Sequence, residues 1–187
     1  LIADPLTRMM CSPIGDGAAA VLVTTAEKAR QLTTKPVLVK ASTLGSSNKH
    51  DADSPGIVPS VAQKAYEQAG IGPDDLHVVE VHDATAPAEL LVYEELGLCQ
   101  PGQGGQLIDD GVTQLGGRCP VNPSGGLLAK GHPVGATGVA QICEIFWQLR
   151  GEAGERQVEG AKVGLTENGG GVIDGENAAA SVHVFTV

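Results

Sequence analysis

Apolar residues gather along this chain in short runs that predict strands. Such runs lie at 17–25 (GAAAVLVTT), 36–46 (PVLVKASTLGS) and 76–83 (LHVVEVHD), with polar or turn-forming residues between them. Two more apolar segments, at 161–166 and 178–187, are expected to close the chain as strands around the turn ENGGGVIDGEN. The run at 17–25 follows a loop-like stretch that offers no neighbouring strand, so we expect it to need a sheet from elsewhere.

Helical periodicity predicts three helices between these runs. The first begins near Val58 and ends at Gly70, with Tyr66 on its apolar face and therefore in the core. The second covers 86–97, because a proline opens it and a glycine closes it. The third, VAQICEIFWQLR at 139–150, is apolar on nearly every face, as a helix buried all round is. Strands that alternate with helices describe a layered α/β domain.

Two further stretches are predicted to be loops. SSNKHDADSPG at 46–56 is polar and turn-rich, so its composition favours a surface loop. The segment at 98–123 is long, rich in glycine and poor in apolar periodicity. Loops of that length inside compact domains are usually functional or mobile.

Composition limits the class of protein. The 187 residues, 42% of them hydrophobic, suffice for one domain, or for one domain plus a piece of another. The net charge is −10 and the twelve Lys and Arg are scattered, so we expect no nucleic acid partner and no anionic membrane surface. No signal peptide or membrane-spanning run is visible. The four cysteines lack metal-ligand spacing, so we expect no metal and a reducing, cytoplasmic compartment: Cys11, Cys99, Cys119 and Cys143.

The clearest chemical signal is the stretch 122–138, NPSGGLLAKGHPVGATG. It holds His132 between Gly131 and Pro133, among glycines that let the backbone approach another backbone or a ligand. A glycine-flanked histidine taken alone also fits a connector with a satisfied side chain. The apolar helix that follows favours a deep position at a helix N-terminus instead.

A second candidate site lies where a predicted strand meets a helix. His82 and Asp83 end the strand at 76–83, and ligands of open α/β sheets bind outside the carboxyl ends of strands. Taken alone, His82 fits a strand-end histidine bonded to the backbone equally well.

Three clusters together resemble the thiolase superfamily: EVHDAT around His82, GGLLAKGHPVGATG around His132, and TENGGG around Asn168. The similarity is greatest to thiolases of the sterol carrier protein type, and it extends from DGAAAVLV through GIVPSVAQKAYEQAGI to the closing strand. It implies an α/β fold, the βαβαβαββ carboxyl-terminal half of a thiolase, with a mixed five-stranded sheet and buried helices. Residues 1–30 are then the tail end of the amino-terminal half, and 31–187 are the carboxyl-terminal domain.

The resemblance also implies roles for single residues. His132 matches the Gly-His-Pro histidine, the base that takes the proton of a nucleophilic cysteine and helps to hold the thioester oxygen. His82 matches a histidine that donates a hydrogen bond to the enolate oxygen. The remaining pocket residues are expected to be Asn122, Gly131, Asn168 and Gly170. An acyl-CoA thioester is the expected substrate, with no separate cofactor, and the protein is expected to be a homodimer.

This sequence departs from the family pattern in two ways. None of its four cysteines matches the nucleophile, which belongs to the amino-terminal half, so that half must come from the same protein or from a separate chain. The cysteine that removes the α-proton also has no counterpart. Ala84 stands at one position used for it, and Glu167, which we interpret as a solvated loop acid, stands near the other.

The leading hypothesis is therefore the carboxyl-terminal part of a thiolase-like acyl-CoA acyltransferase, of the acetyl-CoA acetyltransferase or lipid-transfer type, that acts on a carbon–carbon bond beside a thioester. A Cys-His-His site also fits a decarboxylative condensing enzyme, in which loss of carbon dioxide replaces the missing base. Thiolase-like aldolases fit less well, because they have tyrosines where this chain has His82 and His132. Ala84 favours a third hypothesis, a non-catalytic protein that binds acyl-CoA.

Overall fold

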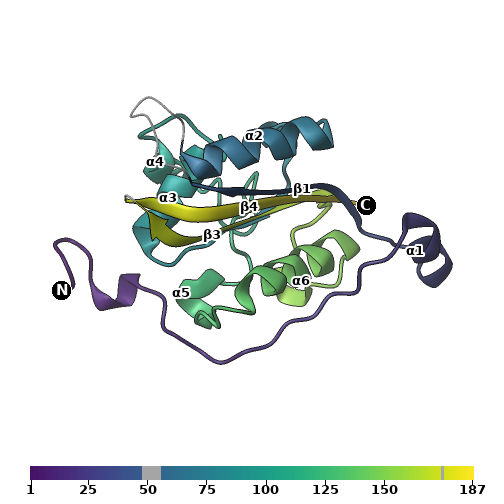
Figure 1. Ribbon diagram of the computed structural model, residues 1–187, viewed down its shortest axis with the longest axis horizontal. Coiled ribbons are helices and arrows are strands. Elements are labelled where there is room, and N and C mark those ends of the chain that lie inside the picture. Colours follow the sequence, from purple (N-terminus) through teal and green to yellow (C-terminus); the bar gives the residue numbers. More distant parts are fainter. Residues whose placement is uncertain (48–55, 174) are drawn as a thin grey trace.

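The computed structural model describes residues 1–47, 56–173 and 175–187, and its centre is a mixed sheet with helices on both faces (Figure 1). In these residues the strands lie in the order β1-β4-β3-β2, with β2 parallel to β3 and the other neighbours antiparallel. Their bounds are β1 Leu38–Ser46, β2 Val78–Glu80, β3 Val163–Ile173 and β4 Glu176–Thr186. The predicted mixed α/β fold is thus confirmed.

The sheet has four regular strands where we expected five. At the position of the fifth, Val121 forms a single parallel bridge with Val79. Prolines on both sides of the Val121–Asn122 pair remove ladder donors, and Asn122 adopts a left-handed conformation with φ 50°. The extended run therefore ends after one paired residue.

Helices cover the two faces of the sheet unequally. α2 packs on β1 and β4 and contacts α3, whereas α6 packs on β3 and β2 from the opposite side (Figure 1). The helices are α1 Ala26–Leu32, α2 Ile57–Ala69, α3 Ala86–Glu95, α4 Gly104–Asp109, α5 Gly126–Lys130 and α6 Thr137–Arg150. Three 3₁₀ turns, Arg8–Met10, Pro73–Asp75 and Gly154–Arg156, complete the described elements. No described helix has the length and apolar character needed to cross a membrane.

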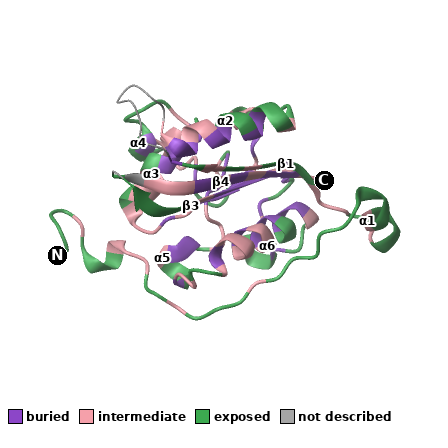
Figure 2. Ribbon diagram, viewed as in Figure 1, coloured by how far each residue is buried: buried purple, intermediate pink, exposed green. Residues whose placement is uncertain are grey.

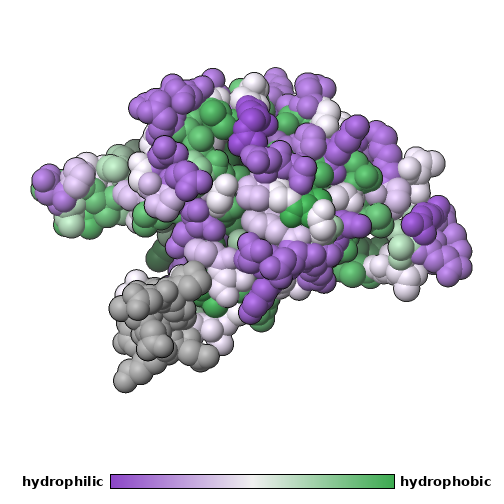
Figure 3. Space-filling model, turned by 90° about the horizontal axis from the view of Figure 1, so that it is seen from above, coloured by the Kyte–Doolittle hydropathy of each residue, from purple (hydrophilic) through white to green (hydrophobic). Residues whose placement is uncertain are grey.

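The predicted first and second helices are confirmed as α2 and α3. Gly70 adopts a left-handed conformation at the end of α2, and the Tyr66 hydroxyl, in the core as expected, donates a hydrogen bond of 2.8 Å to Leu96 O. The first turn of α3 contains a proline, and the Thr85 hydroxyl accepts from Ala88 N at 3.3 Å. The main apolar core lies between these helices and the sheet. Seen from above, the outer surface over α2 is mostly hydrophilic (Figure 3).

The third predicted helix is present as α6, but the expectation that it is buried on all sides is wrong. Phe146 is 39% and Trp147 43% exposed, and the buried residues of the helix include the polar Gln141 and Gln148. Gly164 of β3 allows the close approach of α6, because a Cβ there would overlap Ile145. The smaller apolar cluster on this side contains Val78, Ile145, Leu149, Val158, Ala161 and Phe185.

The predicted strand at 17–25 is not formed with any described strand. The segment runs as an extended coil along α5 and α6 (Figure 1), and the Cys143 thiol contacts Ala20 O at 3.6 Å. Leu22 is 87% and Val23 76% exposed, and Figure 2 shows this part of the chain as mostly exposed. A strand needs a partner for its backbone groups, and this chain supplies none in the described residues.

Three loop predictions have different outcomes. The expected turn between the last two strands is shorter than predicted, because β3 and β4 continue through it and pair Gly169 with Ala180. The segment 98–123 holds the short helix α4, which its sequence did not reveal. The predicted surface loop at 46–56 falls mainly outside the described residues.

Candidate functional site

The structure brings the two predicted histidines together from distant parts of the chain. His82 follows β2 and His132 precedes α6, and their Nε2 atoms lie 3.4 Å apart. The rings meet edge to face, with centroids 5.0 Å apart and an interplanar angle of 75°. Both side chains are partly buried. Two imidazoles at this separation can act on one substrate atom or exchange a proton.

A hydroxyl at the start of α6 fixes the proton of His132. The Thr137 hydroxyl donates its single proton to Pro133 O at 3.2 Å, so its oxygen accepts from His132 Nδ1 at 2.8 Å. Nδ1 therefore carries the hydrogen of the neutral ring. His132 Nε2 is left with its lone pair and faces the site, as a general base requires.

His82 is held in its neutral form by its surroundings. Burial, and secondly the nearby His132, lower the pKa of His82 to about 4. A neutral imidazole whose Nε2 bears the proton donates a hydrogen bond without adding charge. The His82 backbone N–H also donates to Glu167 Oε2 at 3.0 Å, which fixes the residue at the end of β2.

Glu167 is not the solvated loop acid that we expected. It lies within β3 and is 1% exposed, so its side chain faces the interior beneath His82. Burial raises the pKa of its carboxyl to about 7. The sequence concealed this position, because the surrounding glycines indicated a turn where the strand in fact continues.

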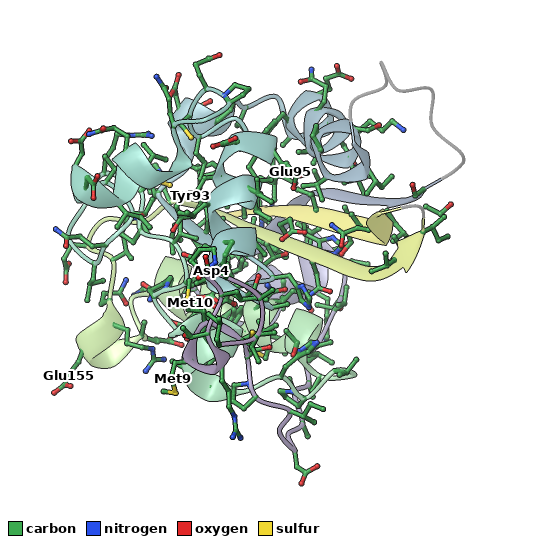
Figure 4. The ribbon with its side chains drawn as sticks, turned by 90° about the vertical axis from the view of Figure 1, so that its left-hand side faces the viewer. Asp4, Met9, Met10, Tyr93, Glu95 and Glu155 are labelled. Atoms are coloured by element: carbon green, nitrogen blue, oxygen red, sulfur yellow. The ribbon has the colours of Figure 1, made fainter. Side chains whose placement is uncertain are left out.

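The amino-terminal segment joins the two histidine loops, a feature that sequence reasoning missed. Ser12 N donates to Ala84 O at 2.9 Å, and His132 N donates to Pro13 O at 2.7 Å. Ile14 forms a bridge with His132, and Cys11 forms one with Thr85. Met9, just before this contact, points outward into solvent, as does Glu155 on another side of the molecule (Figure 4).

Two of the other predicted site residues support these loops. Asn122 Oδ1 accepts from Val81 N at 2.8 Å, directly before His82, and Asn122 Nδ2 donates to Glu89 Oε2 at 3.4 Å. Gly131 ends α5 with φ 85°, and a Cβ there would lie 3.4 Å from Pro13 O. Each residue thus shapes the backbone beside one imidazole.

The remaining two residues lie on β3. Asn168 Nδ2 donates to Gln141 Oε1 at 3.0 Å, which ties the strand to α6. Gly170 is exposed and pairs with Ala179, with open space where a side chain would be. A pocket role for Gly170 stays a prediction.

Two hollows border this face of the molecule. One, of about 450 Å³, lies between the segment 15–19 and residues 133–136, directly after His132. The other, of about 490 Å³, has charged and polar groups on its wall, among them Lys130, Glu144 and Arg156. In the described residues no three His, Cys, Asp or Glu side chains are grouped so that they could hold a metal ion.

Comparison with known proteins gives one consistent family. A profile described as thiolase C-terminal domain-like matches residues 39–184. Acetyl-CoA acetyltransferase of Methanothermobacter thermautotrophicus is 47% identical, over 100% of this chain and 49% of its own length. Sterol carrier protein 2 of Rattus norvegicus is 46% identical, over 89% of this chain and 32% of its own. A benzoylsuccinyl-CoA thiolase subunit of Thauera aromatica is 42% identical, over 91% of this chain and 46% of its own length.

A solved structure shows the same fold. The Ltp2–ChsH2(DUF35) aldolase superposes with a TM-score of 0.79 at 25% identity, over 98% of this chain and 48% of the matched chain. This chain spans between 32% and 49% of the length of these proteins.

Proposed function

The chain belongs to the thiolase family as a thiolase C-terminal domain, and from that premise we propose that it is part of an acyl-CoA acyltransferase that makes or breaks a carbon–carbon bond beside a thioester. The observation that carries the proposal is the pair of imidazoles, with Nε2 atoms 3.4 Å apart. The names of the relatives support the same substrate class, because acetyl-CoA and benzoylsuccinyl-CoA are both CoA thioesters.

In this proposal His132 acts as the base. Its Nε2 takes the proton of a cysteine thiol that the amino-terminal half supplies, and the thiolate attacks the thioester carbonyl. A new C–S bond forms to the cysteine, the bond to the CoA sulfur breaks, and the proton on Nε2 passes to that sulfur. Thr137 supports the role, because its contact with Nδ1 keeps Nε2 free for the proton.

His82 is proposed to stabilise the oxygen on which negative charge develops. A neutral donor in a partly buried site lowers the energy of such an oxyanion and needs no rearrangement at the moment of reaction. The low pKa of His82 supports this role, because at neutral pH its ring does not titrate.

Decarboxylative condensation is the second candidate, and Ala84 favours it. No side chain at that position can remove an α-proton, and Glu167 is buried behind the His82 backbone. A reaction that generates its carbanion by losing carbon dioxide needs neither group. A malonyl-CoA decarboxylation assay separates the candidates. Release of carbon dioxide at the background level would reject decarboxylative condensation and favour ordinary acyl transfer.

We also propose that an amino-terminal thiolase half covers the open side of α6. Phe146, Trp147 and the coil at 17–25 expose apolar groups there, and the chain covers only 49% of the acetyl-CoA acetyltransferase of Methanothermobacter thermautotrophicus. We further propose a homodimer of the complete protein in a reducing compartment. Sedimentation of that protein should give one species of twice the monomer mass, and a stable monomer would contradict the dimer.

The test of function uses the full-length protein and measures acyl transfer with short and long acyl-CoA. We expect His132→Ala to lower kcat by about 10²- to 10⁴-fold, the usual contribution of a positioned base. His82→Ala should cost about 10²- to 10³-fold. His183→Ala on β4 is the matched control, because this histidine contacts Ser42 away from the pair. Equal turnover of wild type and His132→Ala rejects the proposal, and tight acyl-CoA binding without turnover favours a binding protein.

A further inference from the structure

Asp83 lies directly after His82, yet its side chain is held by another part of the chain. The residue is 1% exposed. Its Oδ1 accepts from Leu127 N at 2.6 Å, and its Oδ2 accepts from Leu128 N at 3.2 Å. Both amides belong to the first turn of α5. Each carboxylate oxygen therefore satisfies one backbone donor that the helix leaves unpaired.

The backbone before these amides is shaped to admit the carboxylate. Gly126 has φ 60°, and a Cβ on it would overlap both oxygens and the carboxyl carbon of Asp83. Any other residue at this position would displace either the carboxylate or α5. Close contact with Asp83 and a left-handed conformation thus both require glycine here.

α5 leads straight to the second imidazole. The helix ends at Lys130, Gly131 turns the chain, and His132 follows, so about one helical turn separates the bonded amides from His132. His82 is covalently next to Asp83. The carboxylate is therefore a short link between the two histidine loops, separate from the contacts of Ser12 and Pro13.

We propose that Asp83 is a positioning residue that sets the separation of the His82 and His132 imidazoles. It touches neither substrate nor reacting atoms, and acts through α5. The expected effect of Asp83 on turnover rests on the proposed function, whereas its expected effect on the separation of the two rings does not. An amide cannot replace it, because Asn offers one oxygen and turns an N–H₂ donor toward the second backbone N–H.

The test is Asp83→Asn in the full-length protein, with two readouts. The first is the nuclear Overhauser effect between the two imidazole rings, which does not depend on catalysis. We expect it to weaken at least twofold while the circular dichroism spectrum is retained. The second is kinetics, where kcat should fall by about 10- to 100-fold with KM for acyl-CoA within about twofold, because small misplacements of reacting groups are costly.

Gly126→Ala is the second variant, since it displaces the same carboxylate without changing charge, and it should reproduce both effects. Asp75→Asn is the matched control. Its Oδ2 also accepts a backbone N–H, from Gly72 at 2.8 Å, but in the 3₁₀ turn Pro73–Asp75 rather than in a histidine loop. This control should match the wild type in both readouts.

An unchanged ring-to-ring effect in folded Asp83→Asn overturns the proposal, whatever the activity. If the nuclear Overhauser effect weakens in Asp83→Asn but the full-length wild type shows no acyl transfer, the positioning role is supported and only the proposed function is rejected. If both variants fail to fold, amide exchange in the wild type decides. Leu127 and Leu128 amides should then be protected together, and exchange at the rate of an unfolded peptide overturns the link.

Discussion

The two faces of the sheet are built on different principles. The buried side of α2 is apolar and includes Val58, Val61 and Ala65. The buried side of α6 also contains the polar residues Gln141, Glu144 and Gln148. The first face is a packed core of the ordinary kind. The second combines the smaller apolar cluster around Ile145 and Leu149 with hydrogen bonds and an ion pair of 3.0 Å between Glu144 and Arg156.

The site lies with the polar face. His132 enters α6, and Gln141 Nε2 donates to Glu167 O at 2.9 Å, next to the carboxyl that holds His82. Polar groups with fixed partners keep loops in one arrangement, because any shift leaves a buried group unpaired. The comparison indicates that apolar packing alone stabilises one face, whereas the other adds polar contacts that fix the geometry of the site.

The largest expected effect is on the apolar face. Leu96 is 1% exposed within the main core, so Leu96→Ala should lower the free energy of unfolding by about 2–5 kcal/mol through lost burial and a cavity. Denaturant unfolding of the full-length protein measures it. Leu91→Ala, at an exposed position of α3 shortly before Leu96, is the control. Equal small losses in both would show that this face is not a packed core.

On the polar face, removing hydrogen bonds should matter more than removing volume. Gln148 donates to Glu144 Oε1 at 2.9 Å and to Arg156 O at 2.7 Å, and it accepts from Val158 N at 2.7 Å. Gln148→Leu keeps the volume of the side chain but removes these hydrogen bonds, so their buried partners are left unpaired. The substitution should therefore lower the free energy of unfolding by about 2–3 kcal/mol. A neutral or stabilising result would mean that the polar face packs like the apolar one.

The smallest of the three effects concerns pH. Burial raises the pKa of Glu167 from 4.5 to about 7, so between these values the folded state binds its proton more tightly than the unfolded chain. The stability that the neutral carboxyl contributes is present below pH 4.5 and is lost as pH rises through about 7. Glu167→Gln should therefore remove on the order of 2 kcal/mol of this decline.

Unfolding by urea at pH 5 and pH 8 measures that decline. Burial also raises the pKa of Glu80 to about 7, and Glu80 is present in both proteins. The Glu167→Gln variant should therefore retain part of the decline in stability with pH. The exposed Glu159→Gln serves as control. An identical pH dependence in wild type and Glu167→Gln contradicts the buried position of this carboxyl.

The sequence predicted the apolar face better than the polar one. Periodicity places Val58, Val61 and Tyr66 on one side of α2, and Gly70 ends it, because local propensity and packing agree there. The same rule failed for α6. Phe146 and Trp147 face outward in this chain, toward the side where we propose a missing half, so hydrophobicity alone indicated complete burial.

The site was predictable in its centre and not in its surroundings. His82 stands at the end of a predicted strand and His132 among glycines beside a proline. The resemblance to the thiolase superfamily places both in one site. Nothing in the local sequence shows that Glu167 lies in a strand, that Asp83 binds α5, or that Ser12 reaches Ala84. Those contacts join residues far apart in the chain, and only the folded topology brings them together.

The central claim is that His82 and His132 share one site, and a histidine titration followed by NMR tests it most directly. In the full-length protein the pKa of His82 should lie near 4, because burial and the neighbouring imidazole both disfavour its charged form. In His132→Gln the pKa of His82 should rise, because the neighbouring imidazole that disfavours its charged form is gone. A His82 that titrates near 6.5 with the same value in both proteins would contradict the account.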